Sequence, residues 1–177
     1  MELLQDKAFE GLFRRFRRTA FHLEVQDSYQ TPEETGPFQL FLTGQPDDLA
    51  WHRPWLDLVR GVTSSGKSIK RVRVVSTPHG DYTRWGLWVA PHNIAAGEEI
   101  RWLPRHLLEP GAVTADDYWL FDDDTVAFTV FEPGGRFAGG AVTEDREIVT
   151  YCRAVRDRVW SAAIPHDEYV ASAYVTT

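Results

Sequence analysis

A group of arginine, acidic and aromatic residues gathers in and just after residues 69–77. Arg71 and Arg73 can bind a carboxylate or a phosphate, because a guanidinium group donates two parallel hydrogen bonds to such an anion. Other members lie elsewhere in the sequence and join the site only if the fold brings their segments together. The candidate ligand-binding residues are Glu24, Arg71, Arg73, Ser76, Asp81, Tyr82, Arg84, Trp85 and Arg105.

The same residues also fit a purely structural role. Glu24 and Asp27 follow the first predicted helix and can pair with arginines of the central segment, or with Arg101 and Arg105. Ion-pair networks of this kind occur in many proteins and perturb pKa values without any ligand. The sequence leaves two interpretations open, a pocket for an anion and an ion-pair network that joins the N-terminal part to the sheet.

The segment that carries the two central arginines is predicted to be a strand. The arginines alternate with Val72 and Val74, which is the period of an extended chain, and β-branched side chains favour that conformation. Pro78 ends the run because it has no N–H group for a strand ladder. A strand that leads through a short polar loop into a helix is where α/β folds place ligands.

The remaining periodicities predict elements on both sides of this strand. Helices are expected over residues 6–19, 47–60, 82–96 with a break near Pro91, and from a cap at Thr143 to Pro165. Short strands are expected around 23–25, 38–42, 99–103, 118–121 and 126–131, with Asp122–Asp124 as a hairpin turn. Residues 133–140, rich in glycine, are expected to form a flexible turn.

Together these elements predict a single α/β domain, with α+β as the alternative class, built on one mixed sheet of about five to seven strands flanked by helices. Its parts are an N-terminal helix with short strands (1–46), an α/β core (47–165) and a C-terminal tail (166–177). Strand 69–77 is expected at the centre with Val72 and Val74 buried. The last helix is expected to pack on the sheet through Ile148, Cys152, Val155 and Val159.

Residues 61–68 match the phosphate-binding motif G-x-x-x-x-G-K-[ST]. That motif holds phosphate when a strand precedes the loop and a helix follows it, because the N–H groups at the helix N-terminus then meet the phosphate. Here a helix is predicted before the loop and a strand after it. We therefore expect that Lys67 does not bind a nucleoside triphosphate.

No other motif specifies catalysis, a metal or a cofactor. The histidines lack the spacing of a helix-borne metal site, and none belongs to an H-E-x-x-H motif. A hairpin turn explains Asp122–Asp124 better than a cation site does. Cys152 falls on the apolar face of a helix, which is typical of an inert core thiol. We expect no catalytic residue, no metal and no cofactor.

Composition narrows the class of protein. The chain has 177 residues and a net charge of −7, which argues against general nucleic-acid binding. Its single cysteine excludes an internal disulfide. No apolar run approaches the roughly 18 residues of a membrane span, and the charged first ten residues do not resemble a signal peptide. A cytoplasmic location without membrane association is expected, and the oligomeric state stays open, with a homodimer as one option.

Four segments resemble, in order and over nearly the whole chain, an actinobacterial domain family of unknown function whose members are often encoded beside helix-turn-helix regulators. The resemblance implies an actinobacterial source and a regulator as partner, and it brings no established activity. The segments are Ala20–Glu24 with Asp27 and Tyr29, Arg71–Pro78 with Asp81 and Tyr82, Gly97–Arg105, and Asp117–Asp123.

Residues 55–165 are also similar to half of a phospholipase D-like domain, preceded here by an N-terminal helical extension. Those enzymes need a nucleophilic histidine with a lysine two residues later. His22, His79 and His166 are followed at that spacing by acidic residues. The resemblance therefore implies a catalytically empty fold of the kind that serves as a sensor or interaction domain.

These observations favour a non-catalytic ligand-sensing or protein-interaction domain that works with a transcriptional regulator. The alternative is a small enzyme that acts on an anionic metabolite. In that case Asp81 or Glu24 would serve as acid or base. The substrate would be bound by Arg71, Arg73, Arg84 and Arg105.

Overall fold

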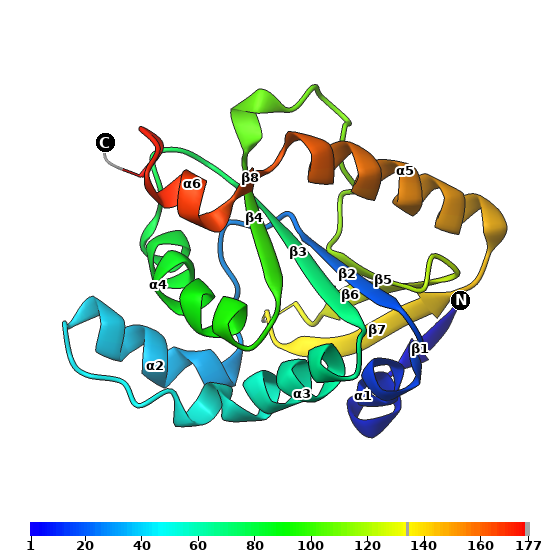
Figure 1. Cartoon of the computed structure of the whole chain (residues 1–177), viewed down its shortest axis with the longest axis horizontal. Helices are drawn as coiled ribbons and strands as arrows, with labels where there is room; N and C mark the ends of the chain where they lie inside the picture. Colours follow the sequence, from blue (N-terminus) through cyan, green and yellow to red (C-terminus); the bar gives the residue numbers. More distant parts are fainter. Residues whose placement is uncertain (134, 176–177) are drawn as a thin grey trace.

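The computed structural model describes residues 1–133 and 135–175, which form one mixed sheet of eight strands flanked by helices (Figure 1). The predicted α/β class and single mixed sheet are confirmed. The strands lie in the order β1-β7-β6-β5-β2-β3-β4-β8. They are β1 Glu2–Leu4, β2 Thr19–Glu24, β3 Ser68–Val75, β4 Glu99–Pro104, β5 Tyr118–Phe121, β6 Thr125–Phe131, β7 Phe137–Thr143 and β8 Ile164–Pro165.

Helices cover both faces of this sheet. The helix α5 packs along one face, whereas α1, α3 and α4 pack on the other, with α2 outside α4 (Figure 1). The α-helices are α1 Asp6–Arg15, α2 Pro32–Leu42, α3 Arg53–Ser64, α4 Asp81–Ala95, α5 Arg146–Ala162 and α6 His166–Val170. Two short 3-10 helices are η1 Ala50–His52 and η2 Arg105–Leu107.

The strands β2, β3 and β4 run parallel and decide which side chains meet. Their register sets His22 beside Arg71 and Glu24 beside Arg73. Side chains alternate between the faces of a strand, so the two arginines share one face while Val72 and Val74 share the other. Both valines are fully buried, as predicted.

The face under α5 is an apolar core. The strands contribute Phe21, Leu23 and Leu120 in addition to the two β3 valines. The helix contributes Val149, Cys152, Val155 and Val159, while Ile148 packs at the edge. The predicted packing of this helix is therefore correct. Its cap is Asp145, whose carboxylate accepts hydrogen bonds from two main-chain N–H groups, and not Thr143, whose hydroxyl accepts from the N–H of Asp145.

Residues 38–42 are helical, so the strand predicted there is wrong. Pro32 occupies the first turn of α2, where its missing N–H group costs nothing. Phe38 and Phe41 lie three residues apart, and this helical spacing lets Phe38 contact Trp85 while Phe41 contacts Trp88 of α4. In α4 itself the predicted break does not occur, because the helix continues through Pro91.

The glycine-rich segment and the C-terminal region are also more ordered than predicted. Gly139 and Gly140 belong to β7, and a side chain on Gly140 would lie 2.5 Å from the ring of Phe9. Tyr169 of α6 is fully buried against Trp102, so residues 166–175 are not a mere tail. Gly134 of the predicted turn and residues 176–177 of the predicted tail lie outside the described residues.

The Asp122–Asp124 hairpin turn is confirmed. Asp122 and Asp123 both have positive φ, as a tight turn between β5 and β6 requires. The Asp122 carboxylate accepts hydrogen bonds from the main-chain N–H groups of Arg17, Arg18 and Thr19 at 2.6, 2.7 and 3.1 Å. The acidic turn therefore anchors the segment between α1 and β2.

Candidate ligand-binding site

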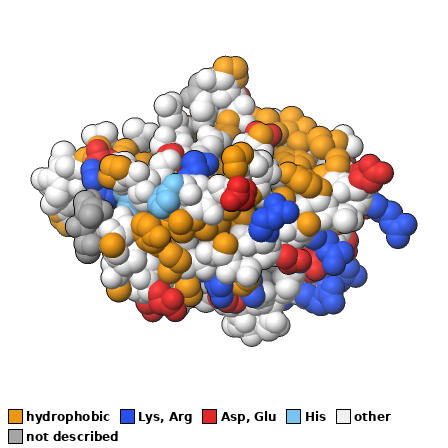
Figure 2. All heavy atoms as spheres, turned by 90° about the horizontal axis from the view of Figure 1, so that it is seen from above, with side chains coloured by type: hydrophobic (Ala, Val, Ile, Leu, Met, Phe, Trp, Pro, Cys, Tyr) orange, Lys and Arg blue, Asp and Glu red, His pale blue; other side chains and the backbone are white. Residues whose placement is uncertain are grey.

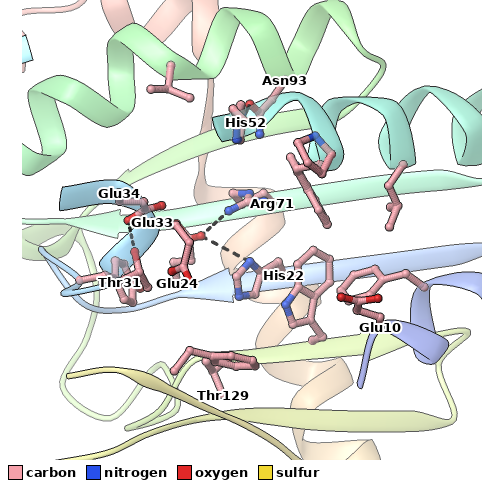
Figure 3. A pocket seen from close by; sticks show the side chains of 18 of the residues that line it. Glu10, His22, Glu24, Thr31, Glu33, Glu34, His52, Arg71, Asn93 and Thr129 are labelled. Carbon is pink, nitrogen blue, oxygen red and sulfur yellow. Dashed lines mark hydrogen bonds and ion pairs between the residues drawn. The ribbon is translucent and has the colours of Figure 1, made fainter. Parts of the chain in front are cut away.

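A cavity of about 1240 Å³ lies on the face of the sheet opposite α5, enclosed by residues of the first four helices (Figure 3). It extends over β2, β3, β5 and β6. Its walls are mainly aromatic, and its floor is polar. The aromatic residues that line it are Phe9, Phe13, Tyr29, Trp51, Trp55, Tyr82, Trp85, Trp119, Phe131 and Phe137.

Buried ion pairs form the floor. The Arg71 Nε atom donates to Glu98 Oε1 at 2.6 Å, and its Nη1 atom donates to Glu24. Arg73 Nε lies 2.9 Å from the second oxygen of Glu24. The side chains of these four residues are at most 19% exposed, so two guanidinium groups and two carboxylates balance one another away from water.

Glu98 connects this floor to the helices. Its second oxygen accepts hydrogen bonds from Asn93 Nδ2 at 2.8 Å and from Trp55 Nε1 at 3.2 Å. The Asn93 oxygen in turn lies 2.6 Å from His52 Nε2. Gly97 permits the turn that places Glu98 here, because its φ is +108° and a side chain would lie 2.5 Å from the Thr63 hydroxyl.

The charges hold each other in fixed states. Burial by itself would raise the pKa of Glu24, but Arg73 and Arg71 outweigh it and lower the pKa to about 2. Burial would lower the pKa of Arg71, yet Glu98 and Glu24 raise it above its usual value. At neutral pH Glu24 and Arg71 are therefore both charged, and each is paired.

His22 stands beside this network as a neutral group. Its ring stacks on Trp119, with centroids 4.1 Å apart and planes at 10°. Burial lowers the pKa of His22 to about 3, and the two arginines add to this effect while Glu24 opposes it. The imidazole can therefore both donate and accept hydrogen bonds at neutral pH.

Unpaired polar atoms gather around the cavity. Among the described residues, every buried side-chain nitrogen or oxygen without a hydrogen bond belongs to a residue that lines it. Glu24 and Arg73 are nevertheless ion-paired, and His22 Nδ1 lies 3.4 Å from Glu24 Oε1. This leaves three atoms, His22 Nε2, Trp85 Nε1 and Thr129 Oγ1, each of which costs about 1–3 kcal/mol if it stays unmatched.

Asp117 and Tyr29 contribute a second polar pair to the lining. Asp117 accepts hydrogen bonds from the Val25 N–H group at 2.7 Å and from the Tyr29 hydroxyl. Burial raises the pKa of Asp117 to about 6, although both hydrogen bonds act in the opposite direction. This carboxyl can therefore gain or lose a proton near neutral pH.

The structure brings together about half of the residues predicted from sequence. Those that line the cavity are Glu24, Arg71, Arg73, Tyr82 and Trp85. Ser76 donates to Asp27 through both its N–H group and its hydroxyl at 2.7 Å, and Arg105 donates to the Val25 carbonyl at 2.6 Å. Asp81 and Arg84 pair with each other on the exposed side of α4. These last four site residues, Ser76, Arg105, Asp81 and Arg84, do not line the cavity.

Several residues that line the cavity were not predicted from the sequence. His22 alternates with the buried Phe21 and Leu23, so the strand period would have placed it on the same face as Glu24. The aromatic pair Trp55 and Trp119 carried no comparable local signal, because the two lie on different elements that only the fold brings together.

The apparent phosphate-binding loop has another role. α3 precedes it and β3 follows it, which is the reverse of the order that the motif needs. The Lys67 ammonium group donates to the Phe16 carbonyl at 2.6 Å and lies over the Phe16 ring. Within residues 1–133 and 135–175, no group of three or more His, Cys, Asp or Glu side chains suits a metal ion. The expectation that the protein uses no cofactor stays a prediction.

The fold and site define an α/β domain with a large, mostly aromatic cavity over a charged floor. Residues 7–171 match the family model of the domain of unknown function DUF6879, and the chain belongs to that family. No curated protein matches the chain. Across the described residues, no helix is both long and apolar enough to cross a membrane. The prediction of membership in a domain family of unknown function is confirmed, while the likeness to a phospholipase D-like half domain stays a prediction.

Proposed function

We propose that this protein is a non-catalytic domain that binds a small molecule and passes its presence to a protein partner. The observation that carries the proposal is the cavity itself, with unpaired polar atoms of His22, Trp85 and Thr129 along its lining. Ligand sites are mainly apolar cavities with a few well-placed polar groups. A ligand that satisfied these atoms would recover the cost of burying them.

Binding fits the site better than catalysis does. Glu24 is held by two arginines, and Asp81 is paired on the far side of α4, so neither suggested acid or base is free to act on a ligand. Cys152 lies in the core under α5, where burial raises the pKa of its thiol to about 11. A reactive nucleophile normally needs a lowered pKa or an adjacent base.

The suggested partner is a helix-turn-helix regulator in the cytoplasm of an actinobacterium, as the sequence resemblance implies. The helix α2 supports a relay of this kind, because Glu33 and Glu34 line the cavity while Leu40 and Leu42 are exposed at its other end. Direct nucleic-acid binding is not proposed. On the face over α5 and α6, basic side chains lie beside acidic ones and hydrophobic ones (Figure 2).

The alternative is a small enzyme that acts on an anionic metabolite. Asp117 favours this alternative, since a carboxyl group with a pKa near 6 beside a cavity can exchange a proton during a reaction. An anionic ligand remains the competing ligand class for the cavity in either case.

A thermal-shift screen of metabolites on the purified protein tests the proposal. We expect at least one compound to raise Tm, and Thr129→Val to reduce that shift because it removes only a cavity hydroxyl. Arg84→Ala, on the exposed side of α4, should leave the shift unchanged. Chromatography of the incubated compound should show no product, and ligand should change co-purification with the neighbouring regulator. Product formation would establish the enzyme alternative, and a screen without any binder would refute the binding function.

A further inference from the structure

We propose that the cavity takes an uncharged, planar heteroaromatic molecule that carries both hydrogen-bond donors and acceptors, of the kind found in nucleobases. The inference rests on the proposed binding function and specifies its ligand class. It replaces an anion, which the arginines suggested in the sequence, with a neutral molecule.

The positive charges of the floor are already paired within the protein. Arg71 is paired with Glu24 and Glu98, and Arg73 is paired with Glu24. An anion would have to displace one of these buried carboxylates, and breaking a buried ion pair is costly. The rest of the lining carries charges of both signs, with Glu10, Glu33, Glu34 and Asp57 beside Arg14, Lys67 and Arg136. These basic groups are engaged as well: Arg14 pairs with Glu10, Arg136 pairs with Glu132, and Lys67 donates to the Phe16 carbonyl.

A cation fits no better than an anion. The favourable place for a cation in an aromatic cavity is over the face of a ring. The Arg71 guanidinium group already occupies that place, 5.8 Å from the ring centroid of Trp55 and 5.9 Å from that of Trp119. The acidic floor residues are likewise committed to the arginines. A ligand without net charge therefore disturbs the site least.

The walls favour a flat aromatic ligand. Trp51 and Trp85 stack with centroids 5.4 Å apart, and Trp55 and Trp119 lie 5.8 Å apart. Aromatic side chains prefer offset-stacked or edge contacts with another π-system, and stacking of one base contributes about 1–3 kcal/mol. The volume of about 1240 Å³ exceeds the roughly 300–1,000 Å³ of typical small-molecule sites, so a base with an attached sugar fits within it.

The unpaired atoms indicate which polar groups the ligand must carry. His22 Nδ1 faces a Glu24 oxygen at 3.4 Å, and this carboxylate favours a proton on Nδ1. The Nε2 atom is then an acceptor that needs an N–H group from the ligand. Trp85 Nε1 can only donate, so it needs a carbonyl or ring nitrogen. Thr129 can do either. The three atoms lie on β2, α4 and β6, so a ligand that reaches more than one of them must carry donors and acceptors at separate positions, as heteroaromatic lactams and amines do.

Isothermal titration calorimetry with three panels of probes tests this ligand class. The uncharged panel holds adenine, cytosine, uracil, their nucleosides, nicotinamide and lumichrome. The anionic panel holds the matching nucleoside 5′-monophosphates, citrate and pyrophosphate, and the cationic panel holds choline and spermidine. We expect a member of the uncharged panel to bind, and a bound nucleoside to bind at least tenfold more tightly than its 5′-monophosphate.

Two variants locate the binding. Thr129→Val removes one polar atom with little change of shape, whereas Trp85→Phe removes the indole N–H group together with part of the ring system, and either should weaken binding by about threefold to tenfold. Trp88→Phe is the matched control, because Trp88 lies on the same helix, is 41% exposed and does not line the cavity. It should leave affinity unchanged.

The outcomes separate the ligand class from the proposed function. Binding by the anionic or cationic panel alone would overturn the ligand class and leave the binding function standing. Silence in all three panels would reject the ligand class, and it would also remove support for the binding function if the wider thermal-shift screen were silent too. Binding that Trp88→Phe weakens as much as Thr129→Val would place the ligand outside this cavity.

Discussion

Removal of the Arg71 guanidinium group tests the charge pairing on which the site depends. Arg71→Met substitutes a shorter, unbranched and uncharged side chain and leaves Glu98, whose side chain is fully buried, without a cationic partner. Removing one partner of a buried ion pair typically costs about 3–5 kcal/mol. A domain of this size has a free energy of unfolding of about 5–15 kcal/mol. We therefore expect a variant that folds but is close to the limit of stability.

Urea denaturation followed by circular dichroism at 222 nm measures this loss. Tryptophan fluorescence is unsuitable, because Arg71 borders the rings of Trp55 and Trp119 and its removal would alter their emission in the folded state. The matched control is Arg60→Met. Arg60 forms an exposed pair with Asp57, and such pairs contribute at most about 1 kcal/mol.

A second substitution separates the lost charge from the lost packing. Glu98→Gln removes the carboxylate charge, so the double variant Arg71→Met with Glu98→Gln no longer buries this unpaired charge. We expect it to lose less stability than the sum of the single variants, by about 1–3 kcal/mol. A loss below about 1 kcal/mol for Arg71→Met, or strict additivity, would refute the conclusion that these charges depend on each other.

The ring of His22 should keep its neutral NMR signature down to about pH 4, because burial lowers the pKa of His22 to about 3. The contribution of the neutral ring to the free energy of unfolding is then fully present above pH 6.5, and it is lost as the pH falls through 3. Protonation of this ring near pH 6.5 would contradict its burial. Lys67→Ala should lower Tm by a few degrees through the lost hydrogen bond and should leave the response to ATP and magnesium absent; an ATP-induced shift that needs Lys67 would restore the phosphate-binding interpretation. Gly140→Ala should cost about 1–3 kcal/mol in urea denaturation through its clash with Phe9, whereas Gly61→Ala on an open helix surface should be neutral or stabilising. Equal effects of the two glycine variants would show that the close packing of α1 on β7 is not maintained in solution.

Local periodicity predicted the elements whose side chains show a clear pattern. The alternation in β3, the aromatic strands of the β5–β6 hairpin and the apolar stripe of α5 all appear in the structure close to their expected places. The elements that were missed lack such a pattern. β7 contains two consecutive glycines, β1 and β8 have only three and two residues, and α2 has no buried residue. Their structure depends on neighbours that are distant in the sequence.

The site was predicted only in part for a related reason. The sequence shows that Arg71 and Arg73 share a face, but it does not show which carboxylates face them. Glu98 meets Arg71 only because β3 and β4 pair in parallel with one particular register. The choice between an anion pocket and an ion-pair network therefore depends on which groups pair with each arginine. In the structure these partners are carboxylates of the chain itself.

The contrast between the two faces of the same strands is the strongest argument that the cavity serves a purpose. Under α5, β2 and β3 present Leu23, Val72 and Val74, and a helix fills the space above them. The residues that alternate with them along the same strands point to the opposite face. There Glu24, Arg71 and Arg73 place charged groups beneath a large cavity. Well-packed apolar residues in place of a buried ion-pair network are often as stabilising or more so. Stability alone would therefore favour extending the apolar cluster that Ala20 and Ile69 already form with α1 and α3 on this face, and the unpaired atoms of His22 and Thr129 would have no place in it. A polar floor with unpaired, buried hydrogen-bonding atoms is what the proposed binding function would require.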